Sequence, residues 1–72
     1  MANRVEVVER IRKEYPKGTV VICDCMNDPR PVPSGTRGVV DFVDDIGTIH
    51  CIFDGGRHIG LIEGVDEFHI VK

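Results

Sequence analysis

Short β-branched segments separated by tight turns are the dominant pattern of this sequence. Residues 19–26, 37–43, 48–53 and 57–62 are rich in Val, Ile and Thr and are bounded by Gly, Asn or Asp, and residues 68–71 form a shorter last segment. The connections D-D-I-G and D-G-G are typical of antiparallel hairpins, because glycine takes the left-handed conformation that tight hairpin turns need. The pattern therefore predicts a mainly β fold with five strands.

An amphipathic helix is predicted over residues 3–15, before the first strand. Asn3 is a suitable N-cap, with Glu6 three residues later as in a capping box. Pro16 disfavours helical geometry in the residue before it and so ends the helix. Apolar residues at three- and four-residue spacing form one stripe along this helix. The stripe consists of Val5, Val8, Ile11 and Tyr15.

A length of 72 residues allows a single domain, residues 1–72, with a thin core. We expect a five-stranded, strongly bent antiparallel barrel of the SH3-like type over residues 19–71, with the helix added at its N-terminus. Closure or near closure of the sheet would protect its edges. The expected core residues are Val21, Cys23, Val40, Ile49, Cys51, Phe53, Ile59, Leu61, Phe68 and Ile70.

Five motifs in order resemble a small bacterial domain family recorded only as a domain of unknown function. They are Y-P-K-G-T, M-x-D-P, P-x-G-T-x-G, V-D-D-I-G-T-I-H and G-L-I-x-G-V-D-x-F, and together they cover roughly residues 15–71. Members of that family are often found on phages and other mobile elements, so the resemblance implies this context and no catalytic residues. Cys23 and Cys51 stand where family members carry aliphatic residues, which implies that both fill the core.

The net charge of −3 is unevenly distributed. Residues 1–18 carry five basic and three acidic side chains, whereas residues 41–67 carry seven acidic and one basic. The N-terminus has no export signal and no apolar run reaches membrane-spanning length. With three cysteines, an odd number, the chain is expected to be cytoplasmic with free thiols and without membrane association.

Catalytic and metal sites are not predicted. His50 and Cys51 are neighbours on a strand, so their side chains point to opposite faces and cannot act as a pair. Cys23 and Cys25 are too close in sequence, on a strand, for a zinc knuckle. Asp44 belongs to a turn rather than to a calcium loop. We therefore expect no enzyme activity, metal or cofactor, although a thiol- or metal-dependent activity remains a rival hypothesis.

The predicted function is that of a non-enzymatic protein-interaction module, an accessory protein of a phage or mobile element. Residues 27–37 contain three prolines and form a stiff loop outside the sheet. Some apolar strand residues face away from the core and remain exposed wherever the helix does not cover them. Such an exposed apolar surface indicates binding to an unidentified protein partner or self-association of the chain. The expected partner surface comprises Arg30, Pro31, Val32, Pro33, Arg37, Val20, Ile22 and Ile52.

Binding of nucleic acid is the alternative function. It requires several basic side chains to converge on one phosphate-binding patch. The glutamates between the basic residues of the helix favour an ordinary solvated face instead. The candidate contacts are Arg4, Arg10, Lys13, Lys17, Arg30 and Arg37.

Overall fold

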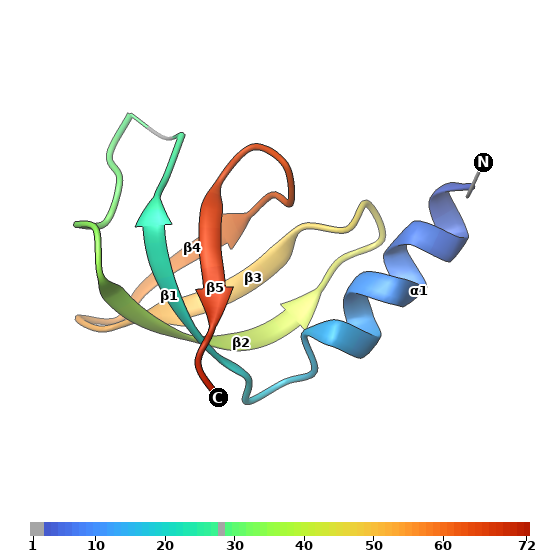
Figure 1. The fold of residues 1–72 in the computed structure, drawn as a ribbon, viewed down its shortest axis with the longest axis horizontal. Coiled ribbons are helices and arrows are strands. Elements are labelled where there is room, and N and C mark those ends of the chain that lie inside the picture. Colours follow the sequence, from blue (N-terminus) through green and yellow to red (C-terminus); the bar gives the residue numbers. More distant parts are fainter. Residues whose placement is uncertain (1–2, 28) are drawn as a thin grey trace.

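The structure, a computed structural model, describes residues 3–27 and 29–72 and is mainly β (Figure 1). Within these residues one helix precedes five strands. The elements are α1 (Arg4–Glu14), β1 (Val20–Cys25), β2 (Thr36–Val43), β3 (Ile49–Phe53), β4 (Arg57–Leu61) and β5 (Glu67–Ile70). Met1 and Ala2 of the predicted domain, and Asp28 of the predicted loop, lie outside the described residues.

The strands form one antiparallel sheet in the order β4-β3-β2-β1-β5. β2 pairs with β1 through its first residues and with β3 through most of its length, and it curves strongly between these partners (Figure 1). Among the described residues no pairing joins β4 to β5, so the sheet is bent but open. The five strands and the antiparallel pairing are confirmed, whereas the sheet does not close into the expected barrel.

The core lies on the concave face of this sheet. Ile59, Phe68 and Ile70 are only partly buried and pack against the core cluster. The other expected core residues are fully buried, namely Val21, Cys23, Val40, Ile49, Cys51, Phe53 and Leu61. Four further residues belong to the same cluster, namely Ile11, Met26, Val32 and Val43. Strand alternation therefore predicts the central core correctly, and the loops and the helix complete it.

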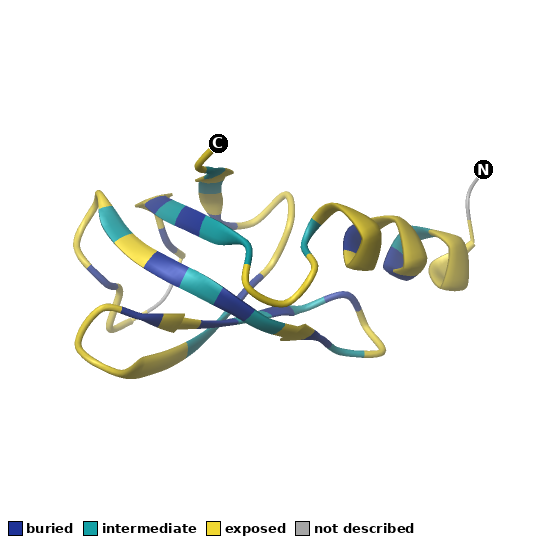
Figure 2. Ribbon diagram, turned by 90° about the horizontal axis from the view of Figure 1, so that it is seen from below, coloured by how far each residue is buried: buried dark blue, intermediate teal, exposed yellow. Residues whose placement is uncertain are grey.

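Helix α1 is capped as expected, because the Asn3 side chain accepts a hydrogen bond from the Glu6 amide at 2.9 Å. Val8 and Ile11 are buried, but Val5 is 63% exposed, so the predicted stripe is wrong at its first position. Figure 2 shows the first turn of α1 exposed and the buried positions further along. In the described part of the chain no helix has the length and hydrophobicity needed to cross a membrane.

Polar contacts fix the helix to two turns of the sheet. Arg12 donates from Nε to the Val43 carbonyl at 3.3 Å and pairs through Nη2 with the Asp45 carboxylate at 3.0 Å. Arg10 pairs with Glu63, which follows β4, at 2.6 Å. The helix thus docks at the end of β2 and does not lie across the outer face of the sheet (Figure 1).

The connection from β4 to β5 is a bend organised by a buried carboxylate. Asp66 is 8% exposed and accepts hydrogen bonds from the amides of Ile62 at 2.9 Å and Asn27 at 2.8 Å. Burying a carboxylate is unfavourable unless hydrogen bonds satisfy it, and here both oxygens are satisfied by backbone donors. Asp66 therefore joins this bend to the beginning of the proline-containing loop.

Candidate interaction surface

An apolar strip follows the outer face of the three central strands. We name it the outer strip, and it consists of Val20, Ile22, Val39, Phe42 and Ile52. Val20 pairs with Val39 and Val39 with Ile52, so these three side chains form one row across the sheet. Phe42 is 51% and Ile52 39% exposed, while the other members are half-buried. The strip therefore presents apolar side chains to solvent opposite the core.

A β-bulge places Phe42 on this face. Regular alternation from Val40 would direct Asp41 outward and Phe42 into the core. The register shifts between Val40 and Phe42, so that Phe42 rather than Asp41 lies opposite His50. Val43 consequently turns inward and is buried. Sequence reasoning missed Phe42 as a surface residue because the extra residue of a bulge leaves no clear mark in the hydrophobic pattern.

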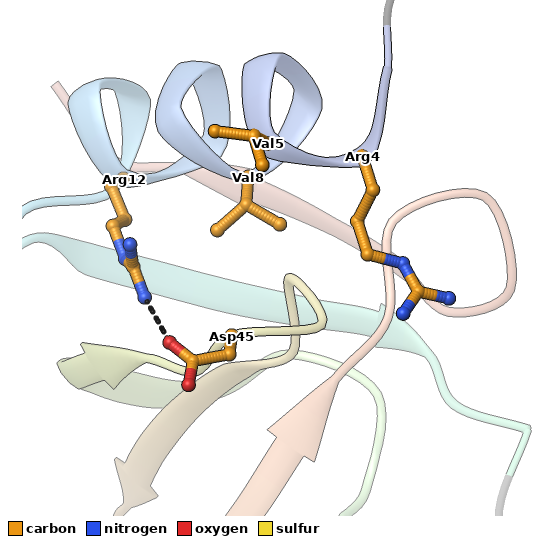
Figure 3. A pocket seen from close by; sticks show the side chains of 5 residues that line it. All are labelled: Arg4, Val5, Val8, Arg12 and Asp45. Carbon is orange, nitrogen blue, oxygen red and sulfur yellow. Dashed lines mark hydrogen bonds and ion pairs between the residues drawn. The ribbon is translucent and has the colours of Figure 1, made fainter.

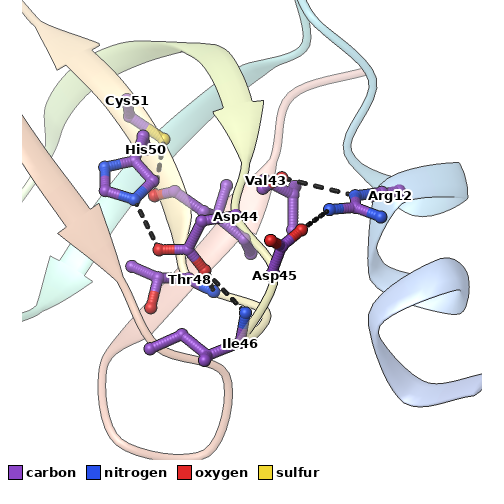
Figure 4. Close-up of polar contacts among 9 residues, drawn as sticks. Arg12, Val43, Asp44, Asp45, Ile46, Thr48, His50 and Cys51 are labelled. Atoms are coloured by element: carbon purple, nitrogen blue, oxygen red, sulfur yellow. Dashed lines mark hydrogen bonds and ion pairs between the residues drawn. The ribbon is translucent and has the colours of Figure 1, made fainter. Parts of the chain in front are cut away.

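Phe42 is held in place by a stacked histidine. The rings of Phe42 and His50 are parallel to within 8° with centroids 4.4 Å apart. His50 Nε2 lies 2.8 Å from Asp44 Oδ2, and the other Asp44 oxygen accepts from the amides of Ile46 and Thr48 (Figure 4). The hydrogen bond to His50, followed by those from the backbone, lowers the pKa of Asp44 below its ordinary value. The β2–β3 turn, residues 44–48, thus positions the aromatic end of the outer strip.

Charged side chains stand at both ends of the outer strip. Arg37 lies opposite Ile22 in the register of β1 and β2, so the two share the outer face. Within the described residues, the Arg37 side chain has no hydrogen bond or ion pair. At the other end Lys17 Nζ lies 3.7 Å from Asp41 Oδ1. Among the described residues, the Arg37 guanidinium on this surface therefore has no ion-pair partner.

The proline-containing loop contributes less to this surface than predicted. Val32 is only 5% exposed and belongs to the core, so it is not part of a partner surface. The Arg30 carbonyl accepts a hydrogen bond from the Arg57 guanidinium at 2.6 Å, which joins the loop to β4. Pro31 and Pro33 are exposed. The other predicted surface residues are exposed or half-buried: Arg30, Pro31, Pro33, Arg37 and Ile52 are exposed, and Val20 and Ile22 are half-buried.

The basic residues of the alternative function are divided between two parts of the fold. The β1–β2 loop and the start of β2, which carry Arg30 and Arg37, lie toward one end of the molecule, and α1 lies at the opposite end (Figure 1). Arg10 pairs with Glu14 at 3.0 Å as well as with Glu63, and Lys17 lies beside Asp41. The remaining candidates on the helix side, Arg4 and Lys13, are exposed. The six candidate contacts therefore fall into two separate groups, and binding of nucleic acid stays a prediction.

The thiols and imidazoles are distributed over different parts of the fold. Burial raises the pKa of the Cys51 thiol to about 11, and burial likewise raises the pKa of Cys23. His50 points away from Cys51 toward Asp44, as strand alternation requires. Cys25 is exposed at the end of β1. No group of three or more metal-ligating side chains occurs in residues 3–27 and 29–72.

Comparison with known proteins identifies a family and no activity. A family model described as "Domain of unknown function (DUF4314)" matches residues 4–71, which span α1 and all five strands. No curated protein and no solved structure matches the chain. The outer strip must therefore be interpreted from its own geometry.

Proposed function

The chain belongs to the DUF4314 family of domains of unknown function, and we propose that it is a non-enzymatic module that binds another protein through its outer strip. The observation that carries this proposal is the exposure of Phe42 and Ile52 on a sheet face that α1 leaves uncovered. Aromatic side chains held rigidly in an apolar setting are typical centres of protein interfaces, because little conformational entropy is lost on binding.

The expected occupant is a partner protein that combines apolar side chains with a carboxylate. The apolar side chains would cover Phe42 and Ile52, and the carboxylate would accept hydrogen bonds from Arg37. An arginine–carboxylate pair is the natural complement here, because the guanidinium donates two parallel hydrogen bonds in a fixed geometry. The partner surface is therefore expected to carry a carboxylate where it meets Arg37 of β2.

The strand connections, the sequence motifs and the thiols support proposals for the fold type, the biological context and the cellular location. A long β1–β2 loop, two tight hairpins and a short bend before β5 match the connections of SH3-like barrels, so we assign the fold to that type in an open form. The motif resemblance supports an accessory role on a phage or mobile element. The free thiols of Cys23 and Cys51, both buried, support a cytoplasmic location.

Affinity capture with matched variants tests the proposal. Tagged wild-type protein, Ile52→Asn, Arg37→Glu and the control Ile62→Asn are used to recover bound proteins and nucleic acids from the native cells. Ile62 is an exposed isoleucine outside the outer strip, 47% exposed, so Ile62→Asn controls for the loss of an exposed apolar side chain. We expect one protein to be recovered by the wild type and by Ile62→Asn, and about tenfold less by the other two variants.

Three outcomes would contradict the proposal. The first is equal recovery of the same protein by Ile52→Asn and by the wild type. The second is recovery of nucleic acid by the wild type that is lost in the additional variants Arg4→Gln and Lys13→Gln, which would favour the alternative function. The third is dimerisation of the purified protein that is lost in Ile52→Asn, measured by sedimentation velocity. Circular dichroism and thermal melting establish that each variant is folded.

A further inference from the structure

A second concave surface lies between α1 and the β2–β3 turn, separate from the outer strip. Its cavity volume is about 210 Å³, and its lining residues are Arg4, Val5, Val8, Arg12 and Asp45 (Figure 3). We name it the helix–turn groove. Val5 and Val8 form its apolar wall, and Val5 remains 63% exposed. An exposed valine beside a concave surface is a site where a further apolar side chain can be buried.

Of the two arginines that line the groove, Arg12 is paired with an acidic side chain and Arg4 is not. Arg12 is engaged by the Val43 carbonyl and by the Asp45 carboxylate, 3.0 Å away. Arg4 has no hydrogen bond or ion pair within the described residues. Figure 3 shows the valines between the Arg12–Asp45 pair and Arg4. Because Arg12 offsets the charge of Asp45, the groove carries one uncompensated positive charge at the Arg4 end.

We propose that the helix–turn groove binds a segment of a partner protein in which an apolar side chain is followed by a carboxylate. The apolar side chain packs against Val5 and Val8, and the carboxylate accepts hydrogen bonds from Arg4. The groove is smaller than the roughly 300–1,000 Å³ of typical small-molecule pockets, so it suits one anchoring side chain of a chain that continues across the surface. This site is formed by other elements than the outer strip and is independent of the proposed function.

A titration followed by nuclear magnetic resonance tests this site with a defined probe. The probe is the blocked peptide acetyl-Ser-Leu-Glu-Ser-amide, added to the full-length, ¹⁵N-labelled chain. We expect saturable shifts at the amides of Val5, Val8 and Asp45, with a Kd of about 1 mM, as befits one apolar anchor and one ion pair. Peptides with Gln in place of Glu, or Ala in place of Leu, are expected to bind at least about tenfold more weakly.

Matched variants separate this site from the outer strip. Arg4→Gln is expected to weaken binding of the probe about tenfold. Lys13→Gln, which removes the same charge from an exposed position of α1 outside the groove, is expected to leave binding unchanged. Ile52→Asn is also expected to bind the probe normally, so failure of the proposed function and failure of this site are distinguishable.

The proposal is overturned by any of three results. These are the absence of saturable shifts at the groove up to about 20 mM peptide, equal binding of the Gln peptide, or equal binding by Arg4→Gln. Sodium isovalerate is titrated as a further probe, because it combines the branched side chain of leucine with a carboxylate and has no peptide chain. Binding of isovalerate as tight as that of the peptide would assign the groove to a free acid instead of a protein segment.

Discussion

At the scale of single residues, two glycines lie where a side chain does not fit. A Cβ atom at Gly60 would lie 2.6 Å from Cγ2 of Thr48, and one at Gly38 would lie 2.8 Å from the ring of Phe53. Both distances are shorter than van der Waals contact. Gly60 thus lets β4 pass close to Thr48 and His50, and Gly38 allows Phe53 to fill the core beneath β2.

Gly60→Ala tests the close approach of β4 to the β2–β3 turn. We expect this substitution to lower the free energy of unfolding by about 1–3 kcal/mol, because Thr48 must move. Thr48→Ser removes the obstructing methyl group, so Gly60→Ala in that background should be neutral or slightly stabilising. Urea denaturation of the four proteins of this cycle measures the coupling. An equal loss in both backgrounds would show that the contact with Thr48 is not the cause.

Asp44 makes the stability of the protein depend on pH in the acidic range. Its pKa in the folded state lies below its ordinary value, chiefly because of the hydrogen bond to His50. The ionised carboxylate therefore stabilises the fold above the unfolded pKa of about 3.9, and this contribution is lost as the pH falls through the folded pKa. Asp44→Asn should show a shallower fall of unfolding free energy below about pH 4. Parallel curves for both proteins would contradict this role.

At the scale of elements, the five strands could be predicted because β-branched runs and turn residues mark them directly. The observed bounds differ from the predicted ones by a residue or two, as in the helix Arg4–Glu14, which was predicted over residues 3–15. The D-D-I-G turn is also confirmed, since Gly47 has a φ of 88° and Asp44 caps the turn. These features depend on local sequence, which is why the sequence specifies them.

Three features of the surface could not be predicted, because tertiary contacts decide them. The bulge in β2 exposes Phe42, against the period of the strand. Val32 is buried although prolines flank it, because the loop folds back on the core. Val5 belongs to a regular stripe but lies beyond the part of α1 that meets the sheet. In each case a contact distant in sequence overrides the local pattern.

Because α1 packs against the sheet through its later turns, substitution of Ile11 should destabilise the protein more than substitution of Val5. Ile11 is 4% exposed and belongs to the core cluster, so Ile11→Ala should lower the free energy of unfolding by about 2–4 kcal/mol. Val5→Ala should change it by less than about 0.5 kcal/mol. Chemical denaturation of both variants gives the comparison. Equal losses would mean that the first turn of α1 is also packed.

At the scale of the whole molecule, the helix and the proline-containing loop lie at opposite ends of the open sheet (Figure 1). The carboxylates of residues 41–67 partly engage the basic side chains of α1, as in the pairs of Arg10 with Glu63 and Arg12 with Asp45. Two carboxylates of this acidic part of the sequence thus hold the helix against the sheet, whereas the Arg37 side chain has no ion pair within the described residues.

Site-specific photocrosslinking in the native cells tests whether the outer strip binds a partner protein. Ile52 is replaced by the photoreactive residue p-benzoylphenylalanine, with the same replacement at Ile62 as the control. If the outer strip binds a partner protein, irradiation should give one discrete protein adduct from position 52, none from position 62, and much less from position 52 when Arg37→Glu is added. An adduct of equal yield from both positions, or none from position 52, would contradict the account.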